Sequence, residues 1–185
     1  MASSRPPTPG GAPLPDLLLG EWACLGVLCQ APAHGFAVAA RLKPDGDIGR
    51  VWTMSRSLTY RALDQLVAKG CVEVVTQEPG VAGGPRRILG PTRLGRRRFG
   101  EWLVTPARHL RDLRSELLLK LVLADIVGVP IGPLIEAQRL AVERLAAALG
   151  DPDPADVVAL WRHESAQVAL RFLARLDRAT TGVTS

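Results

Sequence analysis

Residues 50–102 read RVWTMSRSLTYRALDQLVAKGCVEVVTQEPGVAGGPRRILGPTRLGRRRFGEW, and this stretch decides the fold. A helix over about residues 55–69 would carry Ser, Arg, Thr and Tyr on one face and a core-facing set on another: Leu58, Ala62, Leu63 and Leu66. Gly70 suits the left-handed residue that ends a helix, and the β-rich run 71–77 follows it. The loop 79–85 contains three glycines and two prolines, and residues 86–90 can pair back as a second strand. A helix followed by a Gly/Pro-tipped hairpin predicts a winged helix-turn-helix.

The flanking segments complete that module. Residues 17–30 have apolar side chains at helical spacing, and Asp16 is a candidate N-cap for this helix. A second, short helix is expected over residues 36–42. After the hairpin, Thr92 can cap a fourth helix over residues 93–103. Two short helices therefore precede the helix that would enter the DNA groove.

The second half of the chain carries only helical patterns. Residues 113–127 are apolar nearly all round, which predicts a buried helix. Residues 131–149 show an amphipathic stripe, and Asp153-Pro154 is a strong start for a last helix that runs to about Asp177. The predicted class is mostly α: an α+β winged helix with a two-stranded wing, followed by all-α dimerisation helices.

Composition divides the chain into three parts. Residues 1–13 are rich in Pro, Gly and Ser, cannot bury apolar surface, and should form a disordered tail. Residues 14–108 are predicted to form the DNA-binding domain. Residues 109–180 are predicted to form a helical domain for dimerisation and effector binding.

Charge favours an anionic partner. The net charge is +5, and residues 79–100 hold six arginines without any Asp or Glu. The three cysteines, Cys24, Cys29 and Cys71, form no C-x-x-C pair and lie in apolar surroundings, so reduced core thiols are expected. A signal peptide and an uninterrupted 18-residue apolar span are both missing from the sequence. We therefore expect a cytoplasmic protein that has no membrane partner.

Catalytic and metal-binding motifs are not found. The three histidines form no ligand spacing, and no G-x-S-x-G or phosphate-loop pattern occurs. His34 is expected to act as a local capping or packing residue. We predict that the protein is not an enzyme and has no cofactor or metal.

The helix over residues 55–69 supplies the side chains that a major groove requires. Hydroxyls and Tyr can bond phosphates, and Arg can bond guanine or phosphate. Arginines just after the wing tip suit the DNA backbone or the minor groove. The predicted DNA-binding residues are Ser55, Arg56, Ser57, Thr59, Tyr60, Arg61, Arg86 and Arg87. We expect Arg96, Arg97 and Arg98 to point in three directions on one helix, which weakens any common role for them.

The last helix carries a large apolar stripe. Trp161, Val168 and Phe172 share one side of it, as expected for a helix that packs across a dimer, although packing within one chain would give the same pattern. Two-fold dimers bind paired half-sites about one helical turn apart. We therefore predict a homodimer on a double-stranded, palindromic operator.

The chain resembles the PadR-like transcriptional regulators over about residues 17–127. The matching segments are LGVLCQAPAHGFAVAARL, GRVWTMSRSLTYRALDQLVAKGCVEV, PRRILGPTRLGRRRFGEWL and RSELLLKLVLA. Family features correspond to His34-Gly35, to Tyr60 with its Leu pattern and Gly70, and to Thr92 with Gly95. The second wing strand departs from the family, which carries aromatic residues where this chain has Ile88 and Leu89.

The resemblance implies a dimeric repressor with a winged N-terminal domain and a helical C-terminal domain. Some members respond to phenolic acids or hydrophobic drugs, so it also implies a small hydrophobic or phenolic effector. The predicted function is a sequence-specific transcriptional repressor released by such a ligand. The alternative is a winged-helix protein-interaction module, or a ligand-binding helical protein, that does not bind DNA.

Overall fold

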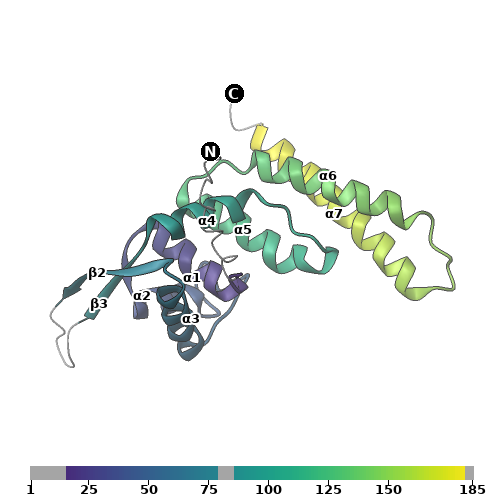
Figure 1. The fold of residues 1–185 in the computed structure, drawn as a ribbon. Helices are drawn as coiled ribbons and strands as arrows, with labels where there is room; N and C mark the ends of the chain where they lie inside the picture. The colour runs from purple at the N-terminus through teal and green to yellow at the C-terminus, as the bar shows by residue number, and fades with distance from the viewer. Residues whose placement is uncertain (1–15, 79–85, 182–185) are drawn as a thin grey trace, which may run out of the picture.

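The computed structural model describes residues 16–78 and 86–181, and Figure 1 shows a winged module joined to a long helical hairpin. The elements follow in this order: α1 (Leu19–Gln30), β1 (Ala33–His34), α2 (Gly35–Leu42), α3 (Arg56–Ala68), β2 (Val72–Glu78), β3 (Arg86–Pro91), α4 (Arg93–Val104), α5 (Leu118–Val127), α6 (Gly132–Leu149) and α7 (Val157–Thr181). A 3-10 turn, Leu110–Asp112, and a π-helical segment, Leu113–Leu117, lead into α5. The predicted fold class, a winged helix with C-terminal helices, is confirmed.

The wing belongs to a three-stranded antiparallel sheet in the order β1-β3-β2. Val74 of β2 lies opposite Leu89 of β3, and a register shift occurs between Val74 and Thr76. On the other side of β3, Ala33 of β1 also lies opposite Leu89. We expected a two-stranded wing, and the two-residue strand β1 adds a third strand that is too short to show any sequence periodicity. The predicted tip, residues 79–85, and the predicted tail, residues 1–13, lie outside the described residues.

Two helix starts differ from the sequence prediction. The N-cap of α1 is Leu18, not Asp16, and its N–H donates to Glu21 Oε2 at 2.7 Å. Glu21 is 2% exposed and pairs with Lys69 at 2.7 Å, so a long-range ion pair fixes this end of the helix. The helix α7 begins at Val157, where the Asp156 carboxylate accepts from two backbone N–H groups, rather than at Asp153-Pro154.

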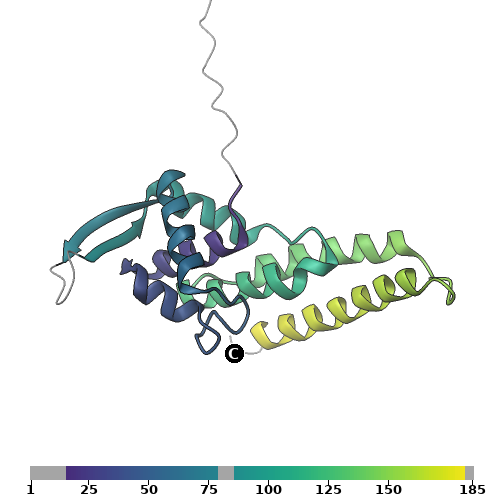
Figure 2. The same ribbon diagram turned by 90° about the horizontal axis from the view of Figure 1, so that it is seen from below.

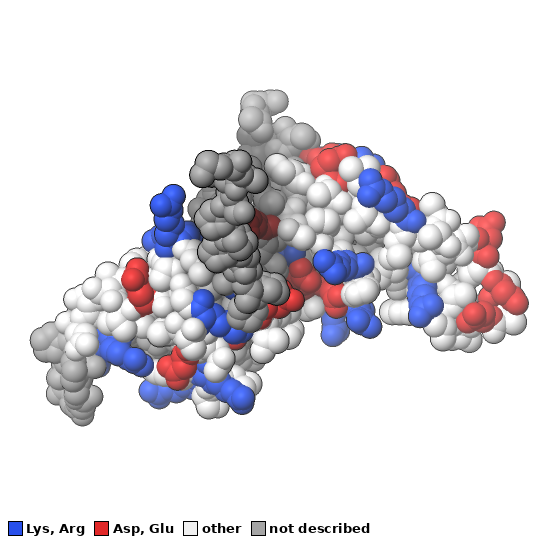
Figure 3. Space-filling model, viewed as in Figure 1, with Lys and Arg blue, Asp and Glu red and all other residues white. Residues whose placement is uncertain are grey.

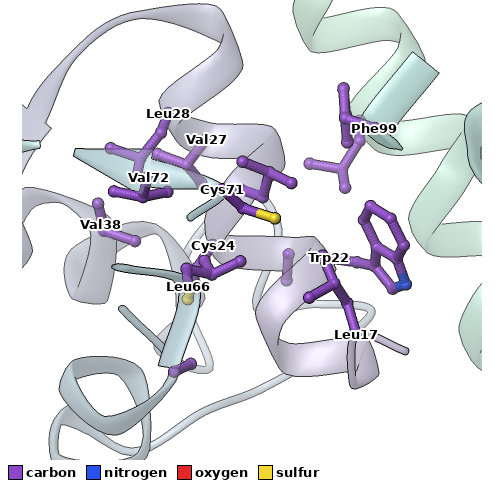
Figure 4. Packing of buried hydrophobic residues seen from close by; sticks show 14 of the residues in the cluster. Leu17, Trp22, Cys24, Val27, Leu28, Val38, Leu66, Cys71, Val72 and Phe99 are labelled. Atoms are coloured by element: carbon purple, nitrogen blue, oxygen red, sulfur yellow. The ribbon is translucent and has the colours of Figure 1, made fainter. Parts of the chain in front are cut away.

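One hydrophobic core holds the winged module together, and Figure 4 shows part of it around α1. Leu25 and Leu28 of α1 have no exposed surface, like Leu66 of α3. Leu123 of α5 closes the core from the other side, so close to α1 that a Cβ at Gly26 would lie 2.7 Å from it. The first long apolar helix of the C-terminal half therefore packs on the N-terminal module, and the predicted domain boundary near residue 108 stays a prediction.

A second core joins α6 to α7. It contains Leu134 and Ile135 of α6, Ala166 and Leu173 of α7, and Leu117 from the π-helical segment. Figure 2 shows α6 and α7 running side by side as a hairpin that projects from the winged module. This hairpin places the N-terminal half of α7 well away from the wing.

Buried polar side chains clamp the segment that links α4 to α5. The Gln138 amide, 1% exposed, accepts from Ala107 N–H at 2.7 Å and donates to Ala107 C=O at 3.1 Å. The Lys120 ammonium, fully buried, donates to Thr105 C=O at 2.6 Å and to Glu116 at 2.5 Å. Because the linker's polar groups are paired with α5 and α6, the hairpin and the winged module are held in a defined arrangement.

Candidate nucleic-acid interface

The helix α3 is built to present a polar face. Ser55 caps it by accepting from Leu58 N–H at 3.3 Å, at about the residue where the sequence predicted the helix to start. Ala62, Leu63 and Leu66 point into the core, which turns the opposite face outward. Ser57, Tyr60 and Arg61 are exposed on the outside of the helix. The local sequence thus fixes both the helix start and the side that remains accessible.

Two neighbouring residues of α3 exchange the roles that we expected. Leu58, expected in the core, is 53% exposed, whereas Thr59, expected near DNA, is 0% exposed. The Thr59 hydroxyl donates to Ser55 C=O at 3.0 Å. Residue 59 precedes Ala62 and Leu63 by three and four positions, so it shares their face and turns inward. The prediction of Thr59 as a DNA-binding residue is therefore corrected.

A hollow of about 750 Å³ lies between the N-terminus of α2, the outer side of α3 and the start of β3. It brings together predicted residues that are far apart in sequence. Its polar and aromatic lining includes Phe36, Arg56, Tyr60, Asp64, Arg86 and Arg87. Figure 3 shows blue Lys and Arg side chains over this end of the molecule, at the lower left.

Contacts inside the hollow hold the arginines near aromatic rings and a carboxylate. The Arg56 guanidinium carbon lies 5.4 Å from the Phe36 ring centre and 5.7 Å from that of Tyr60. Arg87 Nη2 lies 3.9 Å from Asp64 Oδ1, which ties the wing to α3. The hydroxyl oxygens of Ser55 and Ser57 are hydrogen-bonded at 3.1 Å at the start of α3. These positions suit DNA contact, which itself stays a prediction.

The N-terminus of α2 approaches α3 closely. His34 caps α2 through Nδ1, which accepts from Ala37 N–H at 3.0 Å, so its expected capping role is confirmed. A Cβ added at Gly35 would lie 2.9 Å from Tyr60 Cε1. Glycine at this position lets the Tyr60 ring sit against the α2 backbone, a contact that no sequence pattern indicated.

The three consecutive arginines of α4 have separate surroundings. Arg97 lies 3.9 Å from Glu101, and Arg98 stands 5.9 Å from the Trp22 ring centre. Arg96 lies near enough to Cys29 to lower the pKa of that thiol slightly, against the larger effect of burial. As expected from their spacing, these side chains form no single surface.

A second feature lies on the helical hairpin, far from the wing. An apolar groove of about 490 Å³ runs between α7 and the segment before α5. Leu113 and Leu117 line one side of it. The predicted dimerisation residues line the other side and are exposed: Trp161 by 72%, Val168 by 55% and Phe172 by 37%.

The cysteines are packing residues. All three are free thiols, with Cys24 and Cys71 buried and Cys29 half-buried. Burial, with a smaller effect from the Glu21 charge, raises the pKa of the Cys24 thiol to about 12. Burial raises the pKa of Cys29 to about 11. The thiolates of Cys24 and Cys29 are scarcely populated at neutral pH, which suits neither metal binding nor nucleophilic chemistry.

Over the described residues 16–78 and 86–181, no group of three His, Cys, Asp or Glu side chains is arranged to hold a metal ion. Within the same ranges, each helix is too short or too polar to cross a membrane.

Comparison with known proteins finds a similarity in the N-terminal part. Residues 24–101 match a family model described as the transcriptional regulator PadR-like family. No curated protein matches the chain. Bacillus subtilis PadR in complex with operator DNA is 15% identical, with 89% of this chain and 97% of that chain covered and a TM-score of 0.45. Bacillus subtilis PadR in complex with p-coumaric acid is 16% identical, with 90% and 96% covered and a TM-score of 0.43.

Proposed function

We propose, from the match of residues 24–101 to the PadR-like family of transcriptional regulators, that this protein binds double-stranded DNA at specific sequences and regulates transcription. One observation carries the proposal. The hollow between α3 and β3 places Arg56 and Tyr60 of the helix beside Arg86 and Arg87 of the wing. A helix for the groove and a cationic strand for the backbone thus lie on one face.

In this proposal, α3 enters the major groove. Ser57, Tyr60 and Arg61 are exposed on its outer side and are the candidates for contacts with bases and phosphates. Arg56 and the capping Ser55 lie at its first turn, where recognition helices meet the base edges. Arg86 and Arg87 hold the DNA backbone from the wing.

We further propose a homodimer on a palindromic operator. The groove beside α7 exposes large apolar side chains that a soluble chain normally covers, among them Trp161 at 72% and Val168 at 55%. A second copy would bury both stripes against each other through the same patch on each chain. Each of the two winged modules would then bind one half-site, and the phosphate contacts of both modules would contribute to the affinity.

Repression, and its release by a small hydrophobic or phenolic ligand, are carried over from the family resemblance alone. We assign no residue of this chain to such a ligand. We propose no catalysis, because the members of this family are regulators.

The test is selection of bound sequences from a library of random double-stranded DNA, followed by titration of the selected duplex against salt. The proposal expects an enriched palindrome and an affinity that falls steeply as salt rises, because several arginines release counterions. Absence of enrichment, together with binding that salt leaves unchanged, would overturn it. That result would favour a module that recognises proteins through the same helix and wing.

A further inference from the structure

An acidic side chain stands among the arginines of the hollow. Asp64 lies on the outer side of α3, and its side chain is 70% exposed. Among the described residues that line the hollow, the other charged side chains are Arg56, Arg86 and Arg87. A carboxylate on the face that is proposed to meet DNA repels phosphates and weakens binding to every sequence. Its presence there needs a reason.

Folding stability does not supply that reason. The ion pair with Arg87 is long, at 3.9 Å, and both side chains are more than half exposed. Exposed pairs of this kind contribute little to the free energy of unfolding, since water screens them and their side chains lose freedom. Asp64 also makes no helix cap, because it lies in the middle of α3.

Asp64 lies on the same face of α3 as the residues that are proposed to contact bases. It follows Tyr60 by four residues and Arg61 by three, so these side chains share one face of the helix. When the carboxylate is ionised, its oxygens accept hydrogen bonds and cannot donate them. In the major groove, cytosine offers an amino donor at N4, adenine offers a donor at N6 beside an acceptor at N7, and guanine and the thymine O4 offer acceptors. The adenine N7 repels a carboxylate, so cytosine is its best partner. A carboxylate is therefore paired opposite cytosine and repelled opposite guanine or thymine.

We propose that Asp64 is a specificity-determining residue, whose carboxylate accepts from a cytosine amino group in the operator and meets no such donor on other DNA. This inference rests on the proposed DNA-binding function. On unrelated sequences Asp64 keeps Arg87 in the ion pair, so Arg87 does not contact a phosphate of the DNA backbone. On the operator, the base takes over the carboxylate and Arg87 turns to a phosphate. Specificity then comes from a repulsive group as well as from attractive ones.

The test compares wild type with Asp64→Asn on two duplexes of equal length, the selected operator and a scrambled sequence, over a range of salt. We expect affinity for the scrambled duplex to rise about five-fold, because a negative charge is removed and Arg87 is freed. Affinity for the operator should not rise, since the charged bond to cytosine is weakened. The ratio of the two affinities should fall by about five-fold or more. Selection with the variant should also lose a preference for cytosine at one position of each half-site.

A matched control removes the same charge elsewhere. Glu73 is exposed on β2, opposite Gly90, and does not line the hollow. Glu73→Gln should shift both affinities slightly and equally. The ion pair is tested in an Arg87→Ala background, in which Asp64→Asn should give a smaller gain on scrambled DNA. An undiminished gain there would overturn the role of Arg87.

Equal gains on both duplexes in Asp64→Asn would mean a simple charge effect and would overturn the inference, as would an unchanged affinity ratio. These outcomes differ from failure of the proposed function, in which wild type itself would bind no DNA in a salt-dependent manner. Because Asp64 is exposed, both variants should unfold at the wild-type temperature.

Discussion

The indole rings of Trp22 and Trp102 stack with their centres 4.8 Å apart and their planes 7° from parallel. The stack joins α1 to α4, and a cation stands near each ring. The Arg98 guanidinium carbon lies 5.9 Å from the centre of Trp22, and Lys120 Nζ lies 4.8 Å from the centre of Trp102. Because Lys120 belongs to α5, the stack also connects the winged module to the helices that follow it.

Removal of Trp22 should therefore destabilise the whole module. Its side chain is 9% exposed, and Trp22→Ala should lower the free energy of unfolding by about 3–5 kcal/mol through lost burial and the cavity left behind. Urea denaturation measures the loss. Val104→Ala, at a 49% exposed site on α4, serves as the control and should stay within about 0.5 kcal/mol of wild type. Similar losses in both variants would contradict a structural role for the stack.

Lys120 should make stability depend on alkaline pH. Burial lowers the pKa of this ammonium below its ordinary 10.5, although the hydrogen bond and charge of Glu116 favour the protonated form. Between the lowered pKa and 10.5, the unfolded chain holds more protons than the folded chain. The free energy of unfolding should consequently rise with pH in that window.

Lys120→Met removes this titration while keeping an apolar stem in the core. The difference between wild-type and variant stability, measured by denaturation at several alkaline pH values, should shift in favour of wild type as pH rises. A difference that stays constant with pH would show that the folded and unfolded states release this proton together.

Gly35→Ala should weaken DNA binding without unfolding the protein. The added Cβ would lie 2.9 Å from Tyr60 Cε1, so the Tyr60 ring must turn away from its place in the hollow. A lost contact of this kind costs about 1 kcal/mol, roughly five-fold in operator affinity. Gly100→Ala is the control, because a Cβ there meets nothing within 4 Å and should leave operator affinity unchanged. Equal affinities for Gly35→Ala and wild type would argue against a role for Tyr60 in this position.

The groove and wing contacts should respond differently to substitution. Arg61→Ala and Tyr60→Ala should each cost roughly 1–3 kcal/mol of operator binding, and specificity should relax at the base that each one contacts. Arg86→Ala should weaken all sequences alike and lower the salt slope by about one unit. Gel-shift titrations of operator and scrambled duplexes at several salt concentrations separate the two patterns. If Arg61→Ala left operator affinity unchanged, the orientation of α3 in the groove would be wrong.

Local signals in the sequence predicted most of the winged module. The start of α3 at Ser55 and of α4 at Thr92 follow from short-range capping bonds, to Leu58 N–H and to Gly95 N–H. The order of helix, strand, tip and strand was also predicted from the sequence, because glycines and prolines mark the turns. The hollow between α3 and β3 follows from that order, which brings Arg56 and Arg87 together.

Long-range contacts explain what the sequence did not reveal. The start of α1 depends on Glu21 and Lys69, which lie 48 positions apart. The exchange of Leu58 and Thr59 depends on where the core meets α3, a choice between adjacent positions that periodicity leaves open. No sequence pattern indicates that the polar side chains of Lys120 and Gln138 are buried, and their bonds to the linker account for that burial.

The exposed stripe of α7 gives the sharpest test of assembly. Trp161 and Val168 are 72% and 55% exposed beside an apolar groove, so a charge introduced there should prevent two copies from covering it. Sedimentation of wild type should give twice the chain mass of 19.8 kDa, and Val168→Asp should give the monomer mass. Since a single winged module binds weakly, the variant should also lose most of its operator affinity at protein concentrations at which wild type binds. Arg162→Ala, at an exposed site on α7 about a third of a turn around the helix from Val168, should keep the wild-type mass and affinity. A dimer that persists in Val168→Asp, or a monomeric wild type that binds a palindrome tightly, would move the interface away from this groove.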